Sequence, residues 1–167
     1  MSPTQEMLKE MFEYREDGNL IRRHSIGGNG NKAGRVVGTK PKNDRDNRYS
    51  ATKVHGEHWC VHKLIYLYHY GYVPKQLDHI NCDTSDNRIE NLREANSSEN
   101  MMNRRIFSNN KSGYKGVSWS KSHGKWFVYM NVGKVRKNFG HYDDLEIAAL
   151  LASEVRDLHH GNFVCHR

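Results

Sequence analysis

The chain has 167 residues, which is enough for one ordinary domain or two small ones. Its 26 Lys and Arg residues outnumber its 19 Asp and Glu residues, and the formal charge of +7 favours a polyanionic partner. Only 36% of the residues are hydrophobic, and no apolar run approaches the roughly eighteen residues of a membrane-spanning helix, so we expect neither a membrane segment nor a signal peptide.

The first residues predict a short helix followed by a strand. Ser2 is a candidate helix N-cap, with Pro3 at the first helical position and Gln5 completing a capping box. Apolar residues then recur at helical spacing, which indicates a helix that ends near Tyr14. After an Asp-Gly turn, residues 19–23 are predicted to form a strand.

Residues 24–47 have the composition of exposed loops around one short strand at 35–39. A Gly- and Asn-rich part could be mistaken for a phosphate-binding loop. It lacks the Gly-Lys-Ser/Thr ending of such loops, so we expect no nucleotide site there. The basic side chains of this region are candidates for contacts with a DNA backbone: Lys32, Arg35, Lys40 and Lys42.

A hairpin and a helix are predicted next. Residues 49–54 and 58–61 are typical of two strands joined by a turn at Gly56. Residues 62–70 follow as a helix with one apolar stripe, which we expect to face the core. Gly71 is suited to end this helix in the left-handed conformation.

The most informative stretch begins with the adjacent pair Asp78 and His79. Asn91 lies twelve residues beyond His79, and Asn100 lies nine residues further on. A carboxylate, an imidazole and two carboxamides suit a hard divalent cation and water activation, and no thiolate is among them. The Asn/Asp/Ser-rich run between them is also typical of a simple turn whose side chains bond their own backbone.

This spacing resembles the HNH nuclease motif, in the form found in phage and intron-associated homing endonucleases. The resemblance implies a ββα-metal core in which Asp78 ligates one divalent metal, Mg²⁺ or Mn²⁺, and Asn100 completes the metal site from a helix. It implies that His79 is the general base that takes a proton from the attacking water. Asn91 would brace the loop.

Four further residues are candidates for supporting roles around this motif. Ser97 as N-cap of a helix through Arg104 would put Asn100 in its first turn. Arg104 and Arg105 at the far end of that helix are candidates for contacts with flanking phosphates. His62 matches a histidine that commonly precedes the preceding helix in these proteins, and a phosphate contact, a loop brace and a structural role all stay open for it.

The cysteines give no sign of a metal-binding or disulfide framework. Cys60, Cys82 and Cys165 are odd in number, far apart, and never form a Cys-x-x-Cys pair. We therefore expect three reduced thiols and no structural zinc.

A second unit is predicted from residue 108. The segment from Asn100 through Tyr142 has no Asp or Glu but nine Lys and Arg residues, which indicates a nucleic-acid partner. Turn signals divide it into strands at 116–120, 125–131 and 134–139. An amphipathic helix should follow from about residue 143, and its predicted buried side consists of Ile147, Leu150, Leu151, Val155 and Leu158.

The patterns YKGVSW, GKW, NFGHYD, AALLA and GNF make residues 112–164 similar to the AP2 DNA-binding domain. The resemblance implies that the sheet lies in the major groove of DNA. Its candidate contacts are Lys115, Trp119, Lys121, Trp126, Tyr129, Lys134 and Arg136, although one of the two tryptophans could belong to the core. Lys115 stands where plant members carry Arg, and Lys lacks the planar fork that reads guanine.

We therefore predict an α+β protein. Residues 1–107 would hold a β-rich N-terminal region and the ββα-metal nuclease core, the core itself over about 49–107, and residues 108–167 would form the AP2-like domain of three antiparallel strands and a helix. The predicted function is metal-dependent cleavage of double-stranded DNA by a homing-type endonuclease, as a monomer or weak dimer, in the cytoplasm of a phage-infected bacterium. An AP2-type DNA-binding regulator with a vestigial nuclease core, and a structural or RNA-associated protein, are the alternatives.

Overall fold

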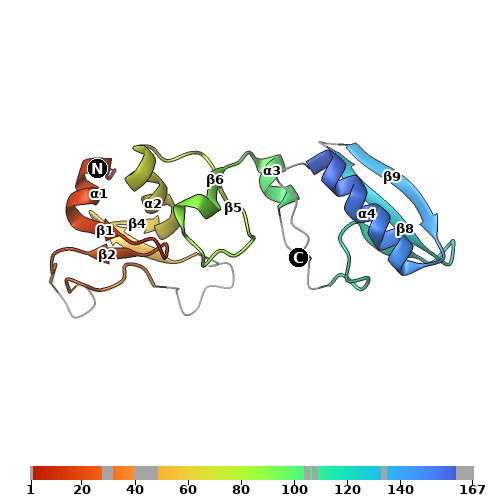
Figure 1. Cartoon of the computed structure of the whole chain (residues 1–167), viewed down its shortest axis with the longest axis horizontal. Helices are drawn as coiled ribbons and strands as arrows, with labels where there is room; N and C mark the ends of the chain where they lie inside the picture. The colour runs from red at the N-terminus through yellow and green to blue at the C-terminus, as the bar shows by residue number, and fades with distance from the viewer. Residues whose placement is uncertain are drawn as a thin grey trace. The chain divides into compact units, whose positions relative to one another are not determined.

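The structure is a computed structural model that describes residues 2–27, 32–39, 49–103, 106, 109–132 and 135–160. The chain divides into two compact units, Met1–Ala95 and Asn96–Arg167 (Figure 1). Both contain helices and small antiparallel sheets, which is compatible with the predicted α+β class. No helix in these described ranges is long and apolar enough to span a membrane. Several residues predicted to contact DNA lie outside the described residues: Lys40, Lys42, Arg104, Arg105 and Lys134.

Among its described residues, the first unit has three two-stranded antiparallel sheets and two α-helices. Its elements are α1 (Gln5–Met11), β1 (Phe12–Tyr14), β2 (Leu20–Arg22), β3 (Ala51–Val54), β4 (Glu57–Cys60), α2 (Val61–Tyr70), β5 (Leu77–His79), the 3₁₀ helix η1 (Ile89–Asn91) and β6 (Leu92–Glu94). The sheets pair β1 with β2, β3 with β4, and β5 with β6. The predicted strand over 35–39 forms only isolated bridges at Val36 and Thr39.

The start of α1 corrects the predicted cap. The Thr4 hydroxyl accepts a hydrogen bond from the Met7 amide and caps the helix, so the prediction of Ser2 as N-cap is wrong. The predicted helix end near Tyr14 is also wrong. The chain turns extended at Phe12, because that residue pairs with β2 and its side chain is completely buried.

The core of the first unit surrounds α2. This helix ends as predicted at Gly71, which has a φ of +80° and donates its N–H to the Leu67 carbonyl. α1 packs beside α2 (Figure 1). The apolar stripe of α2 faces inward as expected, and the core includes Leu8, Phe12, Leu20, Val54, Leu64, Ile65, Leu77 and Leu92.

The second unit consists of a three-stranded antiparallel sheet, a long helix that packs on it, and one short helix. Its elements are α3 (Ser97–Met102), β7 (Val117–Ser120), β8 (Lys125–Val132), β9 (Val135–Tyr142) and α4 (Leu145–His160), with the strand order β7-β8-β9. The three strands and the following helix confirm the elements predicted there. The cap of α3 is Asn96, whose side chain accepts from two backbone amides while Glu99 completes the capping box, so the prediction of Ser97 as N-cap is wrong.

The face that α4 buries differs from the prediction. Ala148 and Ala152 are 0% and 5% exposed against the sheet, whereas Ile147, Leu150 and Leu158 are 57%, 64% and 80% exposed. Small side chains spaced by one helical turn let a helix lie close to a sheet, and the partly buried Leu145 and Leu151 fill the space beside them. The prediction that Ile147, Leu150 and Leu158 are buried is therefore wrong.

Candidate active site

The β5–β6 hairpin positions the adjacent acid and base. Asp78 pairs with Arg93 across the two strands, and His79 pairs with Leu92. All three residues of β5 are buried. Because successive side chains of a strand point to opposite faces, Asp78 and His79 contact different neighbours.

The Asp78 carboxylate is fixed by an ion pair that the sequence analysis did not anticipate. Its Oδ2 atom accepts hydrogen bonds from Arg93 Nε at 2.9 Å and from Arg93 Nη2 at 2.7 Å. The two side chains are only 7% and 16% exposed, so the pair is largely removed from water. One carboxylate oxygen of the predicted metal ligand is thus already bound by a guanidinium.

The imidazole of His79 is oriented by the loop that follows it. Its Nε2 atom lies 3.0 Å from Asn87 Oδ1 in a buried contact. An amide oxygen can only accept, so this contact selects the tautomer with the proton on Nε2. The basic lone pair of His79 then lies on Nδ1.

Two further rings enclose His79. Tyr49 stacks on it with ring centroids 5.8 Å apart, and His62 meets it edge-on at 5.3 Å. His62 is 4% exposed, and its Nδ1 is buried with no hydrogen-bond partner among the described residues. Burial, and secondly the charge of His79, lower the pKa of His62 to about 3, which keeps this ring neutral at physiological pH.

The loop between β5 and η1 is tied together by Asn91. Its side chain donates to Asn81 Oδ1 at 3.0 Å and to the Asp86 carbonyl at 2.7 Å, and it accepts from the Asn81 amide at 3.0 Å. Asp86 also pairs with Arg88, whose hydrogen bonds lower the pKa of that carboxyl to about 2. The loop is therefore held from within by side chains on both of its halves.

The β1–β2 hairpin supports the same loop from outside. The Tyr14 hydroxyl accepts a hydrogen bond from the Ile89 amide at 3.0 Å. Gly18, with a φ of +83°, lies so close to the loop that a Cβ atom there would be 2.5 Å from the backbone nitrogen of Arg88. Neither Tyr14 nor Gly18 carries a signal that sequence reasoning could have linked to a loop some 70 residues away.

The remaining predicted ligand, Asn100, lies on α3, which belongs to the second unit. Within the described residues, no group of three or more His, Cys, Asp or Glu side chains could hold a metal ion. Of the predicted ligands, the first unit contributes the buried Asp78 carboxylate, an oxygen donor of the kind that hard divalent cations prefer. Cys60 is a free thiol, and Cys165 lies outside the described residues.

The predicted DNA contacts of the second unit lie on different surfaces. Tyr129 and Arg136 meet on the face opposite α4, where the guanidinium carbon lies 3.8 Å from the ring centroid. Trp119 and Trp126 pair across β7 and β8 on the α4 side, where Trp126 packs on the core and Trp119 is 50% exposed. Trp126 is thus the tryptophan that contributes to the core. Lys121 is exposed in the β7–β8 turn.

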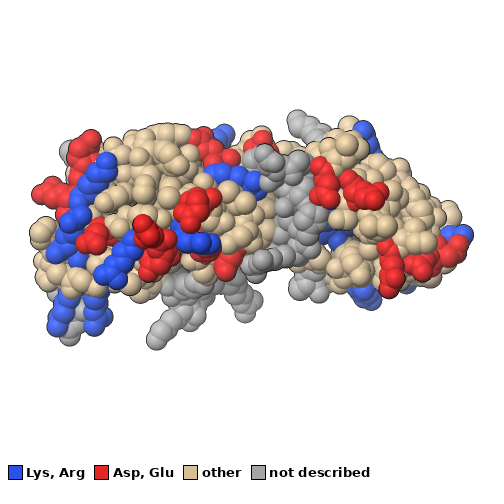
Figure 2. Space-filling model, viewed as in Figure 1, with Lys and Arg blue, Asp and Glu red and all other residues tan. Residues whose placement is uncertain are grey.

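Charge is also unevenly distributed around this unit. The side that carries α4, turned toward the viewer, shows several acidic side chains and few basic ones (Figure 2). The opposite face of the sheet presents a row of stacked rings: His123, His141, Phe127 and Tyr129. Arg136 covers the end of that row, so the sheet face rather than the helix offers the better surface for a polyanion.

Comparison with known proteins places the candidate site in a family context. Residues 60–102 match a family model described as HNH endonuclease, and this range includes Asp78, His79, Asn91 and Asn100. The chain is also 36% identical over 95 residues to "Protein 3.8" of Escherichia phage T7, a match that covers 56% of this chain and 78% of the phage protein. No solved structure matches the chain.

Proposed function

Because this chain belongs to the family of Protein 3.8 of Escherichia phage T7 and carries an HNH endonuclease domain at residues 60–102, we propose that it is a homing-type endonuclease that hydrolyses phosphodiester bonds in duplex DNA. The observation that carries the proposal is the environment of His79. A buried imidazole with its tautomer set by Asn87 directly follows a buried carboxylate in β5, inside the region that matches the HNH endonuclease model.

In the proposed mechanism His79 is the general base. Its Nδ1 lone pair takes a proton from the attacking water, while the Nε2–H bond to Asn87 keeps the ring from rotating. General base catalysis contributes about a hundredfold to ten-thousandfold in rate. The contacts with Tyr49 and His62 restrict the ring further, so little orientational freedom is left to lose in the transition state.

Asp78 and Asn100 would hold one divalent metal, Mg²⁺ or Mn²⁺. HNH nucleases generally use such an ion, and when bound it supplies Lewis-acid stabilisation of the phosphate and of the leaving oxygen. The oxygen donor set fits this class of cation. Arg93 holds the Asp78 carboxylate in place, and its guanidinium would compete with a metal for this ligand.

We further propose that the second unit positions the nuclease on DNA, in the manner of an AP2-type sheet. Tyr129, Arg136 and the rings beside them would contact the duplex, with Lys121 adding a phosphate contact from the turn. Phosphate contacts dominate affinity for duplex DNA and weaken with salt. Binding should therefore fall steeply as the salt concentration rises.

The decisive experiment is cleavage of supercoiled plasmid DNA with and without Mg²⁺ or Mn²⁺. We expect His79→Ala to abolish metal-dependent nicking while duplex binding, followed by gel shift, is retained. His58→Ala on the exposed part of β4 is the matched control and should cleave like the wild type. Cleavage by His79→Ala at the wild-type rate would show that His79 is not the base.

One observation favours the alternative of a DNA-binding regulator with a vestigial nuclease core. The Asp78 carboxylate is bound by Arg93, as it would be in a site that no longer takes a metal. That function predicts tight duplex binding with no cleavage of the bound sequence in Mn²⁺. Linear or nicked product from that sequence would exclude it.

A further inference from the structure

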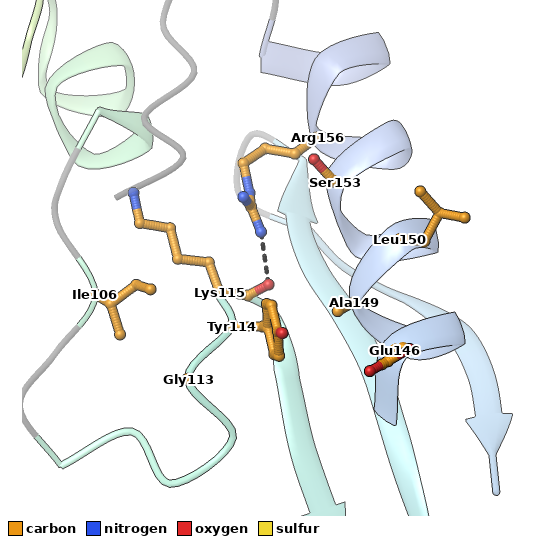
Figure 3. A pocket seen from close by; sticks show the side chains of 9 residues that line it. All are labelled: Ile106, Gly113, Tyr114, Lys115, Glu146, Ala149, Leu150, Ser153 and Arg156. Carbon is orange, nitrogen blue, oxygen red and sulfur yellow. Dashed lines mark hydrogen bonds between the residues drawn. The ribbon is translucent and has the colours of Figure 1, made fainter. Parts of the chain in front are cut away.

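The second unit contains a pocket that takes no part in the proposed chemistry. It lies between α4 and the loop that precedes β7, with a volume of about 460 Å³, within the range typical of small-molecule sites (Figure 3). Five positions of α4 line one side of it, and the loop lines the other. The lining residues are Ile106, Gly113, Tyr114, Lys115, Glu146, Ala149, Leu150, Ser153 and Arg156.

One end of the pocket is cationic. Arg156 is 8% exposed and donates from Nη2 to the Lys115 carbonyl at 2.6 Å, which joins α4 to the loop at this end (Figure 3). Burial, and secondly the charge of Arg156, lower the pKa of Lys115 to about 8, and burial lowers the pKa of Arg156. Lys115 and Arg156 bring two partly desolvated cations to this end of the pocket, and this charge favours an anionic ligand.

The other end of the pocket has a different chemistry. Glu146 lies ten residues before Arg156 on α4, which separates their positions by about 15 Å along the helix axis. Ala149 and Leu150 line the wall between these ends, and Tyr114 lies near Glu146 (Figure 3). The pocket thus offers cations at one end, apolar and aromatic surface along its length, and a carboxylate at the other end.

We propose that this pocket binds a nucleotide, with its phosphate at Lys115, Arg156 and Ser153 and its base toward Tyr114 and Glu146. The order of groups along the pocket matches the order in a nucleotide: an anion, an apolar ring, and an amino group on the base edge that a carboxylate can accept from. The proposal goes beyond the nuclease function because the pocket shares no residue with Asp78 or His79. A free mononucleotide and an unpaired nucleotide of a DNA strand both carry a phosphate and a base, so either could occupy the pocket.

The test is titration of the full chain with 5′-dAMP, followed by calorimetry and by NMR shifts of backbone amides. We expect saturable binding, with the largest shifts at residues 113–115 and 153–156. Lys115→Met and Ser153→Ala should weaken binding by about tenfold or more, because each removes a hydrogen bond to a charged group. Lys137→Met removes the same charge from an exposed position of β9 and should leave the affinity unchanged.

Companion ligands test each part of the assignment. Inorganic phosphate should bind more weakly than 5′-dAMP, deoxyadenosine should not saturate, and 5′-dTMP, which lacks the amino group, should bind more weakly than 5′-dAMP. Glu146→Ala should remove that last difference. A single-stranded oligonucleotide that competes with 5′-dAMP in the wild type but not in Lys115→Met would identify a DNA strand as the source, and no competition would identify the free nucleotide.

Equal losses of 5′-dAMP affinity in Lys115→Met and Lys137→Met would overturn the proposal, because they would mean that only the net charge of the chain matters. So would the absence of saturable 5′-dAMP binding, or shifts confined to the sheet face with Tyr129 and Arg136. These results are independent of the plasmid cleavage assay with His79→Ala. A negative 5′-dAMP titration would therefore not contradict the nuclease function. A negative cleavage assay would not contradict nucleotide binding in the pocket.

Discussion

Replacing Arg93 with Met removes the guanidinium that binds the Asp78 carboxylate. Both of its hydrogen bonds end on Oδ2, at 2.9 Å and 2.7 Å, and neither side chain is more than 16% exposed. The variant therefore leaves a largely buried carboxylate without its cation. Met fills a similar length of space, so lost packing contributes little to the effect.

The magnitude follows from the burial of the pair. Removing one partner of a buried ion pair costs about 3–5 kcal/mol, and the partial exposure of Arg93 places the expected loss near the lower end, at about 3 kcal/mol. For a unit of this size each kcal/mol shifts the melting temperature by about 4–8 °C, so Arg93→Met should lower the Tm of the first unit by about 12–24 °C. The double variant Asp78→Asn with Arg93→Met should recover most of that loss, because no buried charge remains.

The same variants test the proposed metal ligand. Thermal unfolding followed by circular dichroism, with and without Mn²⁺, should show a larger stabilisation by the metal in Arg93→Met than in the wild type. The reason is that Mn²⁺ no longer competes with Arg93 for Asp78, and a ligand that binds only the native state raises its stability. An Arg93→Met variant that melts within a few degrees of the wild type would show that the ion pair contributes little to stability. If Mn²⁺ stabilised the double variant as much as it stabilises Arg93→Met, Asp78 would not be a ligand of the metal.

Three further predictions concern His62, the loop and α4. Because the pKa of His62 is lowered to about 3, only the unfolded chain binds its proton between about pH 6.5 and 3, so the stability of the wild type falls as the pH is lowered through this range. His62→Phe should therefore make the free energy of unfolding, measured with denaturant, depend less on pH between about pH 6.5 and 4. The same slope in both proteins would contradict this. Asn91→Ala removes three hydrogen bonds and should cost about 2–4 kcal/mol in urea unfolding. Ala148→Leu should overpack the contact between α4 and the sheet and lower the free energy of unfolding by about 1–3 kcal/mol. Leu158→Ser, at an exposed position of α4, should leave the free energy of unfolding unchanged. Equal effects of the two substitutions would mean that α4 does not pack on the sheet through Ala148.

Local sequence signals specified most of the secondary structure. The β3–β4 hairpin, α2 with its end at Gly71, and the three strands and helix of the second unit all follow from turn residues and periodicity within short windows. The errors at Ser2 and Ser97 arose because several capping residues stand in a row at each helix start. Only the backbone geometry selects among them, and it selected Thr4 and Asn96.

The face of α4 illustrates a different limit. Its sequence offers apolar residues on two faces, and the larger side chains favoured the face of Ile147 and Leu150. The sheet instead receives Ala148 and Ala152, because close approach of a helix to a sheet depends on side-chain volume at the contact. Periodicity within the helix contains no information about the surface on which it packs.

By itself the sequence determined the residue types of the candidate site: the adjacent Asp78 and His79 and the two carboxamides at family spacing, together with the basic segment that follows. Only the tertiary structure decided what surrounds them. Arg93 on the neighbouring strand holds Asp78, Asn87 sets the tautomer of His79, and His62 encloses it from α2. These contacts depend on strand register and on packing between distant segments, which spacing along the chain does not encode.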